Sequence, residues 1–213
     1  MIKFICSIIF FQIIIFPQQS KLSQAVNYLS GFIASDYFLE LGQTTPQLNL
    51  VDSIYLRAVK FYNEDYSEAL LALTFTTVPY RKVPITLPLI NVEIQYPLIS
   101  ADLDTYLLKN QNLPSQLYYD SPQNNYGDKD KLAHFFGNSF IGYAEPVFDL
   151  ADVFGYFVEA FEEDFKAQSK VDFRDMNVNL YGKLFGDLLE KNKKILPSQV
   201  ILIRSFRYFN LNL

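Results

Sequence analysis

Hydrophobic residues recur at helical spacing through the first part of the chain. The first predicted helix covers residues 21–42, and its apolar face is formed by Leu22, Ala25, Val26, Leu29, Phe32 and Ile33. Apolar residues at three-four spacing predict a second helix within residues 51–62, and Asn63 is the expected N-cap of a third. We therefore interpret residues 21–78 as a helical hairpin region.

The pattern changes over residues 79–129, which are rich in proline and asparagine. Proline lacks an amide N–H and clashes with the preceding helical turn, so long helices are disfavoured there. Apolar and polar residues alternate over residues 92–98, which predicts one short edge strand. Residues 110–129 are expected to form a long loop. The whole stretch is thus predicted to be an extended linker followed by a loop.

Helical spacing returns after this stretch and predicts three helices, over residues 130–143, 149–168 and 173–192. Asp172 is the expected N-cap of the last, and the three helices make a unit over residues 130–196. In the tail, residues 197–213, the apolar run 200–203 predicts a short terminal strand. Three aromatic residues are expected to pack against the body: Phe206, Tyr208 and Phe209. The predicted fold class is therefore mainly α.

The composition supports a folded body without disulfides. Of the 213 residues, 50% are hydrophobic and 16% are aromatic, which is enough apolar surface for a core. The net charge is −5, but residues 166–213 hold 9 of the 18 basic residues and only 4 of the 23 acidic ones. This basic tail is expected either to face the acidic body of its own chain or to contact a membrane surface or another envelope component. Binding to nucleic acid is not expected, because phosphate would repel the acidic chain.

The N-terminus has the pattern of a secretory signal. Lys3 is followed by an apolar run over residues 4–16, which Pro17 ends. The run is shorter than the about 20 residues that a membrane span needs. We predict a signal peptide over residues 1–20 and a periplasmic or secreted protein, with an uncleaved N-terminal membrane anchor as the alternative. The only cysteine, Cys6, lies inside the run, so the remaining chain has no thiolate.

The only histidine belongs to a polar pattern in an otherwise apolar and aromatic region. On a helix, Asp130, His134 and Asn138 fall at i, i+4 and i+8, and therefore share one face. A later helix places four residues on one face: Asp175, Asn179, Gly182 and Gly186. Two polar groups followed by two glycines predict a helix pressed closely against another element, with its polar end in that interface.

These motifs resemble the VanZ-like family. The matching segments are D-K-x-x-H-F at 130–135, an acid at Glu159 and D-x-x-x-N-x-x-G at 175–182, and the resemblance covers residues 128–188. VanZ-like proteins span membranes, whereas this chain has polar residues where their apolar helices lie. It is therefore more similar to a related set of small predicted periplasmic lipoproteins. The family's arginine is not at the corresponding position here, which falls near Ser169, and Arg174 is nearby but out of register. The resemblance implies a role in the cell envelope without an assigned reaction.

The residues of these motifs are the candidate site. The candidate catalytic residues are His134, Asp130, Glu159 and Asp175. The candidate binding residues are Asn179, Lys131 and Asn138. Asp130 could fix the tautomer of His134, which could then act as a base, a ligand or a hydrogen-bond donor near neutral pH. Convergence of His134, Glu159 and Asp175 on a metal ion is a further hypothesis, but we assign no metal and no cofactor.

Three functions fit these patterns. The leading one is an exported, periplasmic cell-envelope protein of uncharacterised activity. The first alternative is an envelope hydrolase acting on lipid or phosphate substrates, with His134 as base or metal ligand. The second is a protein-binding scaffold built on the hairpin 47–79, which requires an exposed apolar groove beside Tyr55, Tyr62 and Tyr66. A working site predicts convergence around an open pocket, whereas a purely structural role predicts a closed, mutually bonded cluster. The sequence does not indicate the oligomeric state.

Overall fold

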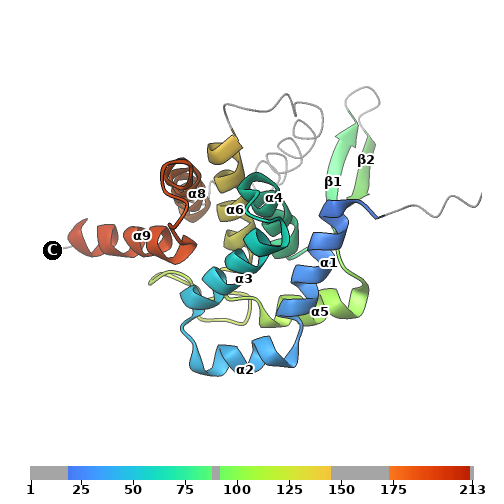
Figure 1. Ribbon diagram of the computed structural model, residues 1–213, viewed down its shortest axis with the longest axis horizontal. Coiled ribbons are helices and arrows are strands. Elements are labelled where there is room, and N and C mark those ends of the chain that lie inside the picture. The colour runs from blue at the N-terminus through green and yellow to red at the C-terminus, as the bar shows by residue number, and fades with distance from the viewer. Residues whose placement is uncertain (1–18, 88–91, 145–172, 212–213) are drawn as a thin grey trace, which may run out of the picture.

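The computed structural model describes residues 19–87, 92–144 and 173–211 (Figure 1). This part of the chain is mainly α, as predicted, with eight helices and one two-stranded sheet. The elements are α1 (Lys21–Ile33), α2 (Asp36–Thr44), α3 (Gln47–Phe61), α4 (Tyr66–Thr77), β1 (Lys82–Leu87), β2 (Val92–Pro97), α5 (Leu103–Asn112), α6 (Lys129–Ala144), α8 (Phe173–Lys191) and α9 (Pro197–Leu211).

Residues 21–42 form two helices instead of the single one predicted. α1 ends at Ile33, and Ser35 begins α2 because its side-chain oxygen accepts a hydrogen bond from the N–H of Phe38. The break brings the rings of Phe32 and Phe38 edge to face, with centroids 5.0 Å apart. Phe38 is buried, although a helix continued from α1 without a break would place it opposite the apolar face of residues 22–33, so the break turns this ring toward the core.

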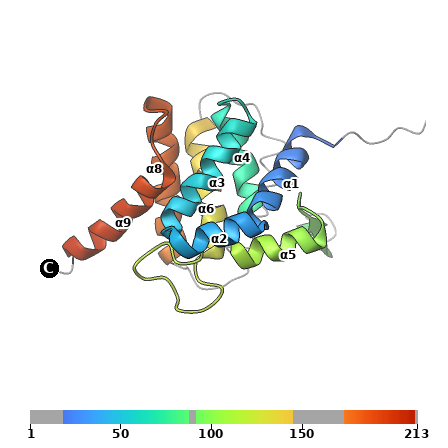
Figure 2. The ribbon, with the colours of Figure 1, turned by 60° about the horizontal axis from the view of Figure 1, so that its bottom comes forward.

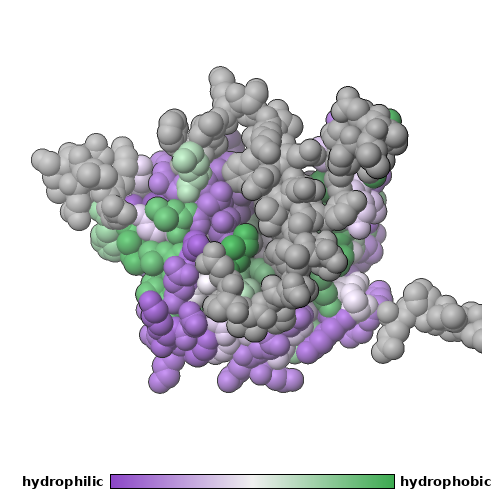
Figure 3. Space-filling model, turned by 90° about the horizontal axis from the view of Figure 1, so that it is seen from above, coloured by the Kyte–Doolittle hydropathy of each residue, from purple (hydrophilic) through white to green (hydrophobic). Residues whose placement is uncertain are grey.

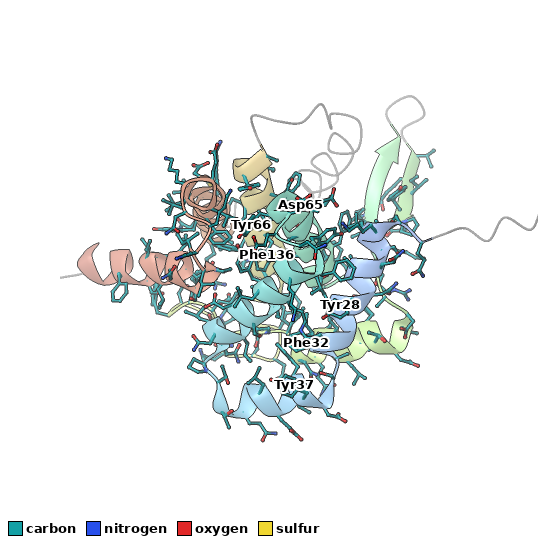
Figure 4. All side chains as sticks on the ribbon, in the orientation of Figure 1. Tyr28, Phe32, Tyr37, Asp65, Tyr66 and Phe136 are labelled. Carbon is teal, nitrogen blue, oxygen red and sulfur yellow. The ribbon has the colours of Figure 1, made fainter. Side chains whose placement is uncertain are left out.

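The turn between α3 and α4 also differs from the prediction. Asn63 and Glu64 have left-handed φ angles of 53° and 69°, so Asn63 is a turn residue and not the N-cap. Asparagine adopts this conformation more readily than most residues, because its short side chain bonds locally. Asp65 is the true cap and accepts a hydrogen bond from the N–H of Glu68. Figure 4 shows Asp65 beside Tyr66 at the start of α4.

Residues 79–129 contain more regular structure than predicted. β1 and β2 form an antiparallel hairpin in the register Lys82↔Pro97, so the predicted strand is confirmed and gains a partner. All six residues of β2 are exposed. The interpretation as linker and loop is wrong for α5, which lies in the proline-free interval between Pro97 and Pro114. Asp102 begins this helix by accepting a hydrogen bond from the N–H of Thr105.

α5 carries a buried lysine that closes the C-terminal end of α4. Lys109 is 2% exposed, and its Nζ donates hydrogen bonds of 2.9 Å to the carbonyl oxygens of Thr76 and Val78. Burial removes the water that would solvate the ammonium and lowers the pKa of Lys109 to about 7. The neutral amine keeps two N–H groups, enough for both carbonyls.

Lys109→Met is expected to flatten the pH dependence of stability between about pH 7 and pH 10. In that window the unfolded chain holds the Lys109 proton and the native chain has released it. Unfolding then takes up a proton, so the free energy of unfolding of the wild type rises with pH, by at most about 1.4 kcal/mol per pH unit. Urea unfolding across this window should show the rise in the wild type and in the exposed-lysine control Lys60→Met. Equal slopes in all three proteins would contradict a buried amine of lowered pKa.

The C-terminal helices confirm part of the prediction. α6 and α8 match the helices predicted over 130–143 and 173–192. The helix predicted over 149–168 and the cap predicted at Asp172 lie outside the described residues.

The predicted terminal strand over residues 200–203 is wrong, because these residues lie within α9. Val200 and Ile201 are fully buried, whereas Leu202 and Ile203 are 41% and 39% exposed. A short apolar run does not distinguish a strand from the buried side of a helix. The prediction that Phe206 packs against the body is also wrong, since it is 65% exposed. The side chains of Tyr208 and Phe209 lie outside the description.

One hydrophobic core joins the N-terminal helices to α6 and α8. Figure 1 and Figure 2 show α6 between α4 and α8. Tyr55 of α3 packs edge to face on Phe185 of α8, and Phe185 packs on Phe135 of α6, each pair with centroids 5.5 Å apart. All three side chains are at most 1% exposed. Burying a ring of this size contributes about 1.5–3 kcal/mol, so the core holds α6 and α8 rigidly beside each other.

Candidate functional site

The interface between α6 and α8 is built on glycine. A Cβ atom at Gly182 would lie 2.4 Å from the carbonyl oxygen of Phe135, and one at Gly186 would lie 2.3 Å from that of Ser139. No other residue permits so close an approach of the two backbones. The predicted close contact between the helix of residues 173–192 and another element is confirmed, and that element is α6.

At the polar end of this interface one lysine bridges two carboxylates. Lys131 Nζ lies 2.9 Å from Oδ2 of Asp130 on α6 and forms a second ion pair with Oδ1 of Asp175 on α8. The side chains are 5% exposed for Lys131, 25% for Asp130 and 11% for Asp175. Burial acts to lower the pKa of Lys131, but its hydrogen bonds to Asp175 and Asp130 outweigh burial and raise the pKa above its ordinary value. Lys131 is therefore charged at neutral pH and neutralises part of the acidic charge.

His134 joins the same two carboxylates. One ligand atom each from His134, Asp130 and Asp175 can be chosen so that all three atoms lie within 4.8 Å of one another. The first two residues share a face of α6, as their spacing predicts, and α8 supplies the third. His134 and Asp130 are half-buried, so solvent reaches one side of the cluster. An imidazole next to carboxylates can accept and return a proton near neutral pH.

An amide pair closes the interface one turn further along. Asn138 Nδ2 donates a hydrogen bond of 2.8 Å to Oδ1 of Asn179 and one of 2.9 Å to the backbone carbonyl oxygen of His134. Two of the three predicted binding residues, Asn138 and Asn179, thus bond to each other across α6 and α8. This part of the cluster is closed and mutually bonded, as a structural role predicts, while the His134 side is partly open.

A second charged network, which the sequence patterns do not reveal, lies just before α6. Asp128 is fully buried, and Arg174 Nη2 forms an ion pair with its Oδ1. Its Oδ2 accepts hydrogen bonds from the Ser121 hydroxyl and, at 3.2 Å, from the N–H of Leu117. Burial acts to lower the pKa of Arg174, but the hydrogen bond to Asp128 and the charges of Asp128 and Asp120 raise it. The only available signal was position: Asp128 and Arg174 stand within two residues of Asp130 and Asp175.

The same network ties the basic tail to the body of the protein. Arg204 of α9 donates two hydrogen bonds to the carboxylate of Asp120, at 3.0 and 2.8 Å, and Arg174 Nε lies 3.3 Å from the same carboxylate. Arg204 is 7% exposed. At this residue the tail therefore faces acidic groups of its own chain, which is one of the two predicted arrangements.

Tyr126 is a further residue beside the cluster that the sequence patterns miss. Desolvation raises its pKa to about 12, and the charges of Asp130 and Asp175 add to this effect while Lys131 opposes it. Its side chain is 52% exposed. The phenol is thus neutral, and able to donate a hydrogen bond, at neutral pH.

Other sequence predictions meet different outcomes. Glu159 lies outside the described residues, so its place relative to the cluster stays a prediction. Tyr55 and Tyr62 are only 1% and 2% exposed, so they line no exposed groove of the kind that the scaffold hypothesis requires.

A pocket lies at the base of the β hairpin, and it is lined by Tyr80, Arg81, Lys82, Leu98, Ser100 and Tyr106. None of these residues belongs to the predicted polar centre.

Part of the hydrophobic surface lies on α8. Figure 3 shows hydrophobic residues on the side of the molecule where α8 and α9 lie. On α8, Met176 and Leu180 are 55% and 58% exposed, and they point roughly 100° and 140° round the helix from Asp175. Among the described helices, none combines the length and the hydropathy that crossing a membrane would require.

Comparison of the chain with family models, with curated proteins and with solved structures finds no match. The resemblance to VanZ-like proteins therefore rests on the motifs of residues 128–188 and stays a prediction.

Proposed function

We propose that this protein is an exported component of the cell envelope, related in role to soluble VanZ-like proteins, and that the cluster of Asp130, His134 and Asp175 is its functional centre. The observation that carries the proposal is the meeting of one imidazole and two carboxylates from α6 and α8 within 4.8 Å. Desolvating several charged groups together costs free energy that apolar residues of similar volume would not cost. The partial exposure of His134 and Asp130 also favours a working site over a purely structural one.

Hydrolysis of a lipid or phosphate ester is the reaction that this chemistry suits best. His134 would either take a proton from water as a general base, or hold an ion that lowers the pKa of a bound water. The resulting hydroxide would attack the carbonyl carbon or the phosphorus. The proton would then pass to the leaving oxygen as the ester bond breaks. Lys131 stands between the two carboxylates, and its positive charge would favour negative charge that develops on a substrate oxygen.

His134→Ala is expected to lower the hydrolytic rate by about 10²–10⁴-fold, the usual contribution of a positioned acid–base group. The rate would be measured on p-nitrophenyl butyrate and bis-p-nitrophenyl phosphate, in periplasmic extracts of bacteria that express the full chain. A chain lacking residues 1–20 should give no activity in that extract, because export would fail. The matched control is Glu190→Gln, an exposed acid on α8, which should keep the wild-type rate.

Two outcomes would overturn the proposal. In the first, the wild-type extract hydrolyses neither substrate faster than an empty-vector extract, and the proposed hydrolytic function is refuted. In the second, the His134→Ala protein keeps the full rate, and the proposed role of His134 in the reaction is refuted. Thermal unfolding of the purified variant separates chemistry from folding, because a loss of several kcal/mol of stability would mark His134 as structural.

A further inference from the structure

The cluster of Asp130, His134 and Asp175 has the donor set of a divalent transition-metal site. One imidazole nitrogen and two carboxylate oxygens suit ions such as Zn²⁺, Mn²⁺ and Fe²⁺, whereas Ca²⁺ and Mg²⁺ prefer oxygen ligands alone. The three residues come from two helices that glycine contacts and the aromatic core hold together, so the donors do not depend on a mobile loop. Asp130 and His134, at i and i+4, present their side chains from one face of α6.

The distances fit an ion after a small adjustment. Ligand atoms on a tetrahedral ion with bonds of about 2.1 Å lie roughly 3.4 Å apart. The three donor atoms lie within 4.8 Å of one another, so they must draw together by at most about 1.4 Å, which side-chain rotation can supply.

A second observation points to a cation at the same place. Asp130 Oδ1 is shielded from solvent and accepts no hydrogen bond within the described part of the chain. A shielded carboxylate oxygen of this kind costs free energy unless something binds it. Its partner atom Oδ2 is held by Lys131, which also pairs with Asp175. The protein therefore already places one positive charge between the carboxylates, and one acceptor atom is left over.

We propose that Asp130, His134 and Asp175 bind one divalent transition-metal ion, and that the Lys131 ammonium is its internal competitor. The ion would draw both carboxylates away from Lys131, and water or substrate would complete its coordination from the side where His134 and Asp130 are half-buried. The inference rests on the proposed function, because it assigns an ion to the same centre.

The test is isothermal titration calorimetry of the purified full chain, stripped with a chelator and free of any histidine tag, with ZnCl₂ and separately with MnCl₂. The wild type is expected to bind one ion per chain, and His134→Ala is expected to bind at least about tenfold more weakly, because one of three protein ligands is lost. Lys131→Met is expected to bind at least about tenfold more tightly, because a positive charge beside the ion is removed. Lys129→Met removes the same charge from the same helix without touching either carboxylate and should leave the affinity unchanged.

The outcomes are separable. Absence of binding by both the wild type and Lys131→Met, or binding that His134→Ala leaves unchanged, overturns the metal site. Binding by Lys131→Met alone also overturns it, since the ammonium would then be the resident cation of the natural protein. If Lys131→Met fails to fold, the comparison of the wild type with His134→Ala still decides, because His134 is not part of the Lys131 ion pairs. Binding is measured without substrate, so a bound ion without hydrolysis refutes only the proposed reaction, and hydrolysis without a bound ion refutes only the metal site.

Discussion

Gly182→Ala and Gly186→Ala are each expected to lower the free energy of unfolding by about 3 kcal/mol. The added methyl group would lie 2.4 or 2.3 Å from a backbone carbonyl oxygen of α6, and a backbone atom cannot rotate aside as a side chain can. α8 must therefore move away, which separates well-packed surfaces at a cost typical of severe overpacking. Alanine favours the helix by up to about 1 kcal/mol over glycine. The measured loss of stability is therefore the free-energy cost of the clash minus this gain in helix propensity.

Gly31→Ala in α1 is the matched control for both variants. No atom lies within 4 Å of the position that a Cβ at Gly31 would take. The same substitution should therefore stabilise the protein by about 0.5–1 kcal/mol, the ordinary helical preference for alanine. Urea unfolding should show a lower free energy of unfolding for Gly182→Ala and Gly186→Ala and a higher one for Gly31→Ala. If Gly182→Ala and Gly186→Ala behaved like Gly31→Ala, the close contact of α6 and α8 would be refuted.

Asp128→Ala is expected to cost about 3 kcal/mol of stability, although Asp128 has no expected part in the reaction. The Asp128 carboxylate is fully buried, and its removal takes from Arg174 an ion-pair partner and from Ser121 and Leu117 a hydrogen-bond acceptor. Breaking a buried pair by removing one partner typically costs about 3–5 kcal/mol. The lower end applies here, because Arg174 keeps its contact with Asp120.

Asp104→Ala provides the comparison for this variant. Asp104 is an exposed acid in the first turn of α5, so its loss should change the free energy of unfolding by no more than about 0.5 kcal/mol. Chemical denaturation at neutral pH compares the two variants directly. Equal, small losses in both would mean that the Asp128 network contributes no more than a surface charge.

Much of the candidate site could be predicted because helical spacing is a local property. The shared face of Asp130, His134 and Asn138 follows from 3.6 residues per turn. The spacing of Asp175 and Gly182 similarly predicts a close contact, but it does not name the partner helix. The bridging position of Lys131 could not be read from spacing, since neighbours at i and i+1 do not share a face. Its long side chain reaches both carboxylates only because α8 lies alongside.

The errors in the fold prediction occur where something other than hydrophobic spacing decides the local structure. The run at residues 200–203 is equally compatible with a strand and with a buried helical face, and packing of Val200 and Ile201 into the core selects the helix. The break after Ile33 and the cap at Asp65 depend on single side-chain hydrogen bonds. Such bonds compete with helix continuation by free energies of about 1 kcal/mol, too small for a hydrophobic pattern to register.

By itself, the sequence determined the mainly helical class of the described chain, the faces that its polar and apolar residues share, and the requirement of α8 for a close neighbour. These properties depend on interactions within a few residues, where spacing controls which side chains meet. Only the tertiary structure decided that α6 is that neighbour, that Lys131 lies between two carboxylates and that Arg174 binds Asp128. Contacts between distant residues depend on how the whole core packs, and no local pattern contains that information.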